Sequence, residues 1–202
     1  MDDDDVWRAI DAQRTALADI LEDLSEQEWH HPSLCEGWTV RDVAAHLTMQ
    51  QTGLGDVLRQ TPLVIRSRGN LNRVIHDAAC RRAEQPTGTL VAQIRGTVGS
   101  RRHNIGVTCR ETLTDILVHS QDIVIPLGRR LDLSPDAAAE AATRIWSRGW
   151  PFYPRRRLHG YRLSATDVPW TVGEGDDVRG PIGSMLLLIT GRLTGVDQVV
   201  SP

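Results

Sequence analysis

The sequence predicts a mainly α protein, an up-down bundle of four or more helices followed by a small C-terminal α+β appendage. Apolar residues recur three and four positions apart along most of the first 150 residues, which is the spacing of helices with one buried face. The connections between these stretches are short and contain glycine or proline, which favours antiparallel neighbouring helices. After about residue 154 the pattern changes to short β-branched and aromatic segments. We therefore expect a bundle domain over residues 1–154 and an appendage over residues 155–202.

Each helix of the bundle has a recognisable start or stop. Thr39 and Asp42 occupy the positions of a capping box, and Pro135 follows Ser134 as a proline at the first helical position. The segment 25–33 is expected to interrupt the helices, and Gly53 and Gly55 to break the chain before a short stretch at 56–59. The expected helices cover residues 5–24, 39–50, 71–84, 89–99, 108–125 and 135–146.

The appendage reads as two strands and one helix. The strands are expected at 161–166 and 169–172, with a glycine-containing turn at 173–175. Gly180 and Pro181 precede an apolar helix at 182–190, and Gly191 ends it. About fifty residues are near the lower limit for independent folding, so we expect this part to pack on the bundle.

Composition excludes several classes of function. A net charge of -3 and a pI near 6.1 argue against nucleic acid as a partner. The longest apolar run, 185–189, is too short to cross a membrane, and the acidic N-terminus does not resemble a signal peptide. The 3 cysteines form no CxxC pair, which favours a reducing cytoplasm. We expect a cytoplasmic monomer or homodimer, and the lack of lysine excludes Schiff-base chemistry.

The candidate site consists of two histidines and one carboxylate on two helices. His46 lies beside the apolar stripe of its helix, where an isolated histidine is usually a core residue with a hydrogen-bond partner. Asp115 and His119 are four residues apart on one face of another helix, in a polar stripe bordered by branched aliphatic residues. This stripe needs a cation, an arginine or a metal if it is buried, whereas an exposed stripe would be an ordinary surface pair. Two histidines and an acid converging inside a bundle describe a three-ligand metal site.

Three segments carry a resemblance to a known family. They are Trp29 with Pro32-Ser33 and Cys35, then Gly37-Trp38-Thr39-Val40-Arg41-Asp42-Val43-Ala44-Ala45-His46-Leu47; Asp115-Ile116-Leu117-Val118-His119-Ser120-Gln121-Asp122-Ile123; and Arg179-Gly180-Pro181 with Leu186-Leu187-Leu188-Ile189-Thr190-Gly191-Arg192. The chain resembles the mycothiol-dependent maleylpyruvate isomerase family of the DinB-like superfamily.

The resemblance implies a DinB-like helix bundle that binds a divalent metal, zinc first and nickel as the alternative. The ligands would be His46, Asp115 and His119. The middle ligand of the characterised isomerase is a glutamate, so Asp115 is one methylene shorter. Glu111, one turn earlier, is a competitor whose spacing fits less well. Asp122 is expected to accept a hydrogen bond from a ligand imidazole.

The resemblance also implies a thiol cofactor, mycothiol or a similar low-molecular-weight thiol, and a small electrophilic substrate. A metal-bound thiol is a thiolate near neutral pH, so the chemistry would be S-transfer or cis–trans isomerisation. Arg192 and Asp122 are the candidate catalytic residues, with Arg192 holding a carboxylate or simply lying at a helix C-terminus. Cys35 is expected to approach the metal without acting as the nucleophile. Trp38 and Trp150 would line the pocket mouth or pack in the core.

Two other functions fit the same three ligands. One is metal-assisted hydrolysis with Asp122 or Glu111 as the base. The other is a non-catalytic metal- or ligand-binding stress protein. In each of these interpretations the partners are small molecules, and we expect the protein to bind neither nucleic acid nor a membrane.

Overall fold

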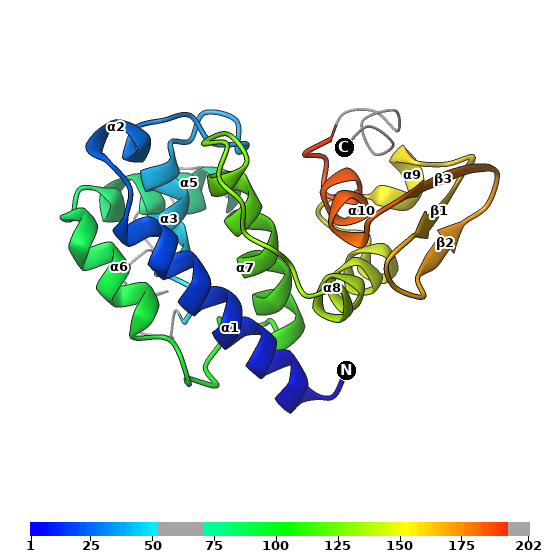
Figure 1. The fold of residues 1–202 in the computed structure, drawn as a ribbon, viewed down its shortest axis with the longest axis horizontal. Coiled ribbons are helices and arrows are strands. Elements are labelled where there is room, and N and C mark those ends of the chain that lie inside the picture. Colours follow the sequence, from blue (N-terminus) through cyan, green and yellow to red (C-terminus); the bar gives the residue numbers. More distant parts are fainter. Residues whose placement is uncertain (52–70, 194–202) are drawn as a thin grey trace.

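The structure is a computed structural model that describes residues 1–51 and 71–193. It confirms the expected fold class, since the described chain is mainly helical with a small sheet near its C-terminal end (Figure 1). The break predicted at Gly53 and Gly55, with the stretch at 56–59, lies outside the described residues.

The N-terminal helices pack around one apolar core. The longest, α1, runs beside both α6 and α7, while α3 packs between α5 and α7 (Figure 1). These helices are α1 (Asp3–Glu22), α2 (Glu26–Trp29), α3 (Val40–Leu47), α5 (Leu71–Ala83), α6 (Thr87–Arg95) and α7 (Cys109–Val124). The core contains apolar faces of these helices, including fully buried Ile10, Val43 and Leu113. Because α3 and α7 lie side by side, His46 and His119 can face each other.

Capping residues fix where the site-bearing helices begin. The predicted capping box of α3 is present, because the Thr39 side chain accepts from the Asp42 amide and the Asp42 side chain accepts from the Thr39 amide. The same reciprocal pair, Thr108 and Glu111, starts α7. From the sequence, Glu111 is considered as a competing metal ligand, and this box is not recognised.

Several expected helix ends change, including that of α3, which ends at Leu47 rather than at residue 50. The segment 25–33, expected as a break, contains the one-turn helix α2, which Ser25 and Glu28 cap reciprocally. Helix α6 covers 87–95 rather than 89–99, because Pro86 occupies the N-cap position and the chain leaves the helix at Gly96. Ser134 keeps its predicted N-cap position, but its side chain caps no backbone amide among the described residues.

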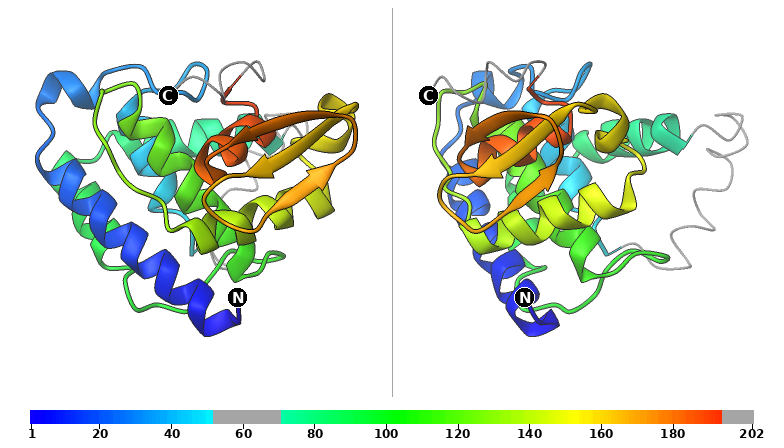
Figure 2. Two further views of the ribbon diagram at one scale, coloured as in Figure 1. Left: turned by 45° about the vertical axis from the view of Figure 1, so that its right-hand side comes forward. Right: turned by 90° about the vertical axis from the view of Figure 1, so that its right-hand side faces the viewer.

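The C-terminal part contains helices around a small sheet. The sheet has the order β2-β1-β3, with β2 antiparallel and β3 parallel to the central strand β1 (Figure 2). Both β3 and α9 were missed from the sequence, since β3 carries a single apolar residue, Val178, and α9 is one turn of mostly arginine. The elements are α8 (Pro135–Arg148), α9 (Pro154–Arg157), β1 (Tyr161–Ala165), β2 (Thr171–Gly173), β3 (Asp176–Gly180) and α10 (Ile182–Ile189).

Helix α8 connects the two parts of the molecule. It packs on α7 from the bundle and on α10 from the C-terminal part, while α10 also packs on β1 (Figure 2). The expected division of the chain at residue 154 stays a prediction.

Among the described residues, each helix is too short or too polar to cross a membrane.

Candidate metal centre

The three predicted ligand residues lie together where α3 passes α7. Asp115 Oδ1 is 3.3 Å from His46 Nε2 and 3.4 Å from His119 Nε2. The two imidazole rings meet edge to face, with their centroids 4.9 Å apart. Because Asp115 and His119 are four residues apart on α7, both side chains face α3.

The distances in this group suit a tetrahedral ion. Bonds of about 2.0–2.2 Å to a tetrahedral zinc place neighbouring ligand atoms about 3.3–3.6 Å apart. The two separations from Asp115 Oδ1 fall within that range, and all three donor atoms lie within 4.8 Å of one another. The side chains are partly exposed, so the group is reachable from a cavity. These donors therefore fit a divalent ion, although metal binding itself stays a prediction.

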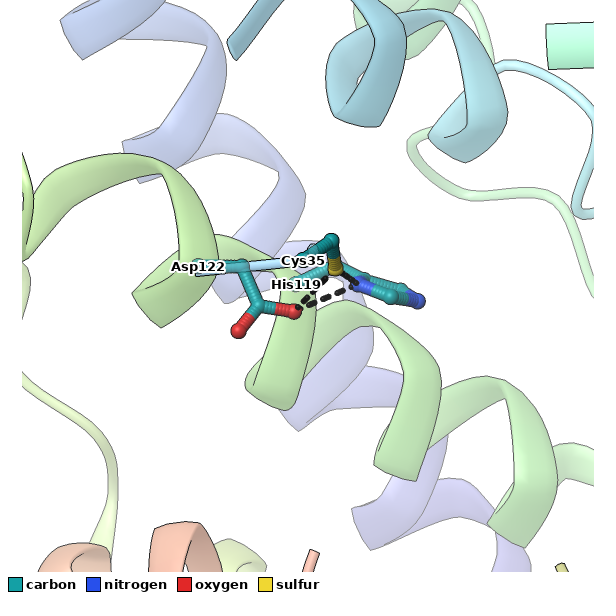
Figure 3. A group of neighbouring side chains, drawn as sticks. All are labelled: Cys35, His119 and Asp122. Atoms are coloured by element: carbon teal, nitrogen blue, oxygen red, sulfur yellow. Dashed lines mark hydrogen bonds and ion pairs between the residues drawn. The ribbon is translucent and has the colours of Figure 1, made fainter. Parts of the chain in front are cut away.

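Asp122 holds His119 from the side away from these donors. Its Oδ2 is 2.8 Å from His119 Nδ1 and 3.0 Å from the Cys35 thiol, which donates to it (Figure 3). An imidazole whose Nδ1–H donates to a carboxylate presents the lone pair of Nε2 on its opposite edge. His46 differs, because its buried Nδ1 has no hydrogen-bond partner among the described residues.

Arg192 neutralises Asp122 through two hydrogen bonds. Its Nε donates to Oδ1 at 3.0 Å and its Nη2 to Oδ2 at 2.9 Å, while Nη1 donates to the Thr190 carbonyl. The Asp122 side chain is completely buried. The paired donors that would clamp a substrate carboxylate are thus occupied by Asp122, and the predicted contact of Arg192 with substrate stays a prediction.

Cys35, His119 and Asp122 form a second group with metal-ligand chemistry. Here the guanidinium of Arg192 already provides the positive charge that Asp122 requires. Cys35 comes from a turn in which Trp38 N–H donates to the Cys35 carbonyl, and Gly37 adopts a positive φ of 77° that suits glycine. The neighbouring Leu34 amide donates to the Asp122 carbonyl, which fixes this turn against α7.

Charges in the site shift the pKa values of its acids and bases. Burial opposes ionisation of Asp115, but His46 and His119 outweigh it and hold the pKa of Asp115 well below its usual value. For His119, burial favours the neutral ring, yet Asp115 and Asp122 raise its pKa well above the usual value. Burial is likewise outweighed at Asp122, where His119 and Arg192 lower the pKa.

Glu111 lies outside the three-donor group. Besides capping α7, its Oε1 accepts from Arg144 and Arg148 at 2.6 Å each. Burial alone would raise the pKa of Glu111, but the bonds from Thr108 and the two arginines lower it from 4.5 to about 2. Its partners are therefore structural ones, which leaves Asp115 as the candidate middle ligand.

A cavity of about 480 Å³ opens beside the three-donor group. His46, Asp115 and His119 line one side, and α8 with the segment that follows it lines another. Trp150 lies at this cavity and is 52% exposed, whereas Trp38 contacts the His46 ring edge to face. The apolar part of the lining comes from Met49, Ile75, Ala78, Ile105, Val107, Val118, Ile145, Trp150, Pro151 and Phe152. The donors thus face a mostly apolar space large enough for a small molecule.

Two residues of the site were missed from the sequence. Gln50 donates from Nε2 to Asp115 Oδ2 at 2.8 Å, and Arg14 donates to the Oε1 of Gln50 at 3.1 Å. No local sequence pattern predicts these contacts, because Gln50 follows α3 whereas Arg14 lies on α1. The apolar positions that flank Arg14 on α1 were the only available hint that its side chain points inward.

Comparison with known proteins supports the predicted resemblance. Residues 10–105 match the family model described as the mycothiol maleylpyruvate isomerase N-terminal domain. A crystal structure described as the mycothiol-dependent maleylpyruvate isomerase shares the fold, with a TM-score of 0.61 at 13% sequence identity, covering 98% of this chain and 91% of that one. A histidine-to-alanine mutant of that enzyme gives a TM-score of 0.63 with the same identity and coverage. Among curated protein sequences, none matches. The family resemblance expected from the three sequence segments is confirmed.

Proposed function

We propose that this protein is a metal- and thiol-dependent isomerase or S-transferase that acts on small electrophilic molecules, with mycothiol or a similar low-molecular-weight thiol as cofactor. The observation that carries the proposal is the three-donor group of His46, Asp115 and His119 beside a cavity, with separations of 3.3 and 3.4 Å that suit a tetrahedral ion. The match of residues 10–105 to the isomerase family model supports the thiol dependence.

His46 Nε2, Asp115 Oδ1 and His119 Nε2 would hold the ion, with zinc as the first expectation and nickel as the alternative. A divalent ion with three protein ligands keeps a position for a thiol and lowers the pKa of that thiol, so that it reacts as a thiolate. The rest of the chemistry is positioning by the chain. Asp122 holds the His119 ring with Nε2 directed away from it, and Arg192 keeps Asp122 ionised.

The cavity wall supports an electrophilic substrate with an apolar part. Val118, Ile145 and Phe152 are among its apolar lining residues, and apolar side chains offer no hydrogen bonds to water. Arg144 and Arg148 also line the cavity and share the single carboxylate of Glu111, so one positive charge there is not neutralised by that acid. This excess charge favours a substrate or thiol with an acidic group.

The geometry weighs against metal-assisted hydrolysis with a carboxylate base. Asp122 is completely buried and bound by Arg192, and Glu111 is bound by Thr108 and two arginines. A general base must reach the proton and accept it near neutral pH, which a carboxylate with a low pKa does poorly. Both pKa values are instead lowered, that of Glu111 to about 2.

The first test compares purified parent protein with His46→Ala and Asp115→Ala for bound zinc and nickel and for turnover. Maleylpyruvate serves as the isomerisation substrate and 1-chloro-2,4-dinitrobenzene as the transfer substrate, each with and without mycothiol. We expect near-stoichiometric metal in the parent, loss of metal in both variants, and turnover that requires both metal and thiol.

The outcomes separate the three functions. Cleavage of maleylpyruvate by water at an equal rate with and without thiol would select a hydrolase, whereas tight metal without turnover on either substrate would select a non-catalytic binding protein. A parent that binds neither ion would overturn the metal centre. Circular dichroism of both variants shows whether metal loss reflects the missing ligand or a failure to fold.

A further inference from the structure

Arg14 is a completely buried arginine far in sequence from the candidate metal centre. It lies on α1, its side chain is 0% exposed, and its nearest acid is Asp11 at 3.6 Å. Burial lowers its pKa, which Asp11 and Asp115 oppose. An arginine retains its charge in proteins, and a buried charge is costly without strong partners. An apolar side chain would fill this place in the core without that cost, so the guanidinium requires an explanation.

The hydrogen bonds of Arg14 connect it to Asp115 through Gln50. Nη1 of Arg14 donates to the Thr97 carbonyl at 3.0 Å, and Nη2 donates to Oε1 of Gln50 at 3.1 Å. Gln50 is itself only 4% exposed, and its Nε2 donates to Asp115 Oδ2 at 2.8 Å. These contacts form a continuous chain from α1 to the middle ligand of the candidate centre.

The chemistry of the end groups dictates the orientation of the Gln50 amide. A guanidinium only donates hydrogen bonds and an ionised carboxylate only accepts them. The amide oxygen must therefore face Arg14 and the amide nitrogen must face Asp115. If the amide were flipped, its NH2 group would face the N–H donors of Arg14 and its oxygen would face the carboxylate of Asp115, so neither hydrogen bond would form.

The fixed amide selects which oxygen of Asp115 faces the imidazoles. Rotation about the last bond of an aspartate is soft, so an unsupported carboxylate would present either oxygen or both. Here Oδ2 is held by Gln50, while Oδ1 lies 3.3 and 3.4 Å from the two histidine nitrogens. We propose that Arg14 and Gln50 are positioning residues that fix Asp115 as a ligand through Oδ1 alone. This inference rests on the proposed metal centre.

A structural role makes a different prediction. If Arg14 and Gln50 only join α1 to its neighbours, their loss would reduce stability and leave metal binding unchanged. Gln13 provides a matched control, since it is a buried glutamine on the same helix as Arg14, is 6% exposed, and its amide nitrogen has no hydrogen-bond partner among the described residues.

The experiment measures zinc affinity by competition with a chromogenic chelator, and the visible spectrum of bound Co²⁺, for parent, Gln50→Met and Gln13→Met. Supporting partners of metal ligands typically contribute about 10–100-fold in affinity. We expect a loss of that size and an altered Co²⁺ spectrum for Gln50→Met, and parent values for Gln13→Met.

Equal zinc affinity and equal spectra for Gln50→Met and the parent would overturn the proposal, even if stability falls. If Gln50→Met does not fold, Gln50→Asn replaces it, because this amide is one methylene too short to bridge Arg14 and Asp115. A parent that binds neither zinc nor Co²⁺ overturns both the centre and the positioning role. A parent that binds zinc but shows no thiol-dependent turnover overturns the proposed function alone.

Discussion

Helix α7 carries two carboxylates that arginines from the C-terminal part bind in similar ways. Glu111, in its first turn, accepts from Arg144 and Arg148, and Asp122, in its last turns, accepts from Arg192. Both pKa values are lowered. The difference lies in the other partners, which are the Thr108 cap for Glu111 and the His119 ring with the Cys35 thiol for Asp122. Similar ion pairs therefore serve helix formation at one end of α7 and the candidate metal centre at the other.

Replacement of Asp122 by asparagine should have the largest effect, because it changes both stability and metal binding. Removing one partner of a buried ion pair costs about 3–5 kcal/mol, since it leaves Arg192 uncompensated. His119 also loses its carboxylate acceptor, so zinc affinity should fall by about 10–100-fold. Urea unfolding of the metal-free protein and chelator competition measure the two effects. Parent-like zinc affinity would show that Asp122 is a structural acid like Glu111.

Glu111→Gln should reduce stability without changing zinc affinity. The lowered pKa of Glu111, about 2 instead of 4.5, corresponds to at most ~3 kcal/mol at neutral pH. Because the folded-state pKa is the lower one, this stability is fully present above pH 4.5 and is lost as the pH falls through about 2. Urea unfolding at a series of pH values checks this. The difference in unfolding free energy between parent and Glu111→Gln should be largest near pH 6 and should shrink as the pH falls. A marked loss of zinc by this variant would contradict the division of roles.

Cys35→Ser should have the smallest effect. A serine hydroxyl also donates to Asp122, so the free energy of unfolding should change by less than ~1 kcal/mol. Zinc affinity should change by less than the ~10-fold expected for a residue that supports a ligand. Chelator competition checks this, and complete loss of zinc would instead assign the ion to Cys35, His119 and Asp122.

The sequence predicted the part of the site that local spacing determines. The interval of four residues between Asp115 and His119, and the three from His119 to Asp122, place these side chains on one face of a helix before any tertiary contact is known. His46 joined them through the family resemblance. The Glu111 box was also visible as Thr108 followed by an acid three residues later, and was overlooked.

The remaining contacts depend on tertiary packing. Arg192 reaches Asp122 across 70 positions, because Gly191 takes a positive φ of 82° after α10 and turns the chain back. Arg14 and Gln50 are separated by 36 positions and come together only in the folded bundle, where the Gln50 side chain, after the end of α3, accepts a hydrogen bond from Arg14 on α1. Strand β3 was missed for a similar reason, since pairing with β1 rather than its own composition makes it a strand.

Two groups of residues that line the cavity differ in their chemistry. The candidate metal donors come from α3 and α7, while Ile145, Trp150 and Phe152 come from α8 and the segment after it. Ile145 and Trp150 can be substituted without removing a donor or the Arg192–Asp122 pair, whereas Phe152 lies against the Arg192 guanidinium, which is 5.7 Å from the centre of its ring. Under the proposed function, changes at such lining positions would alter which small molecule fits the cavity while the donor group stays the same, so that selectivity would evolve separately from the chemistry.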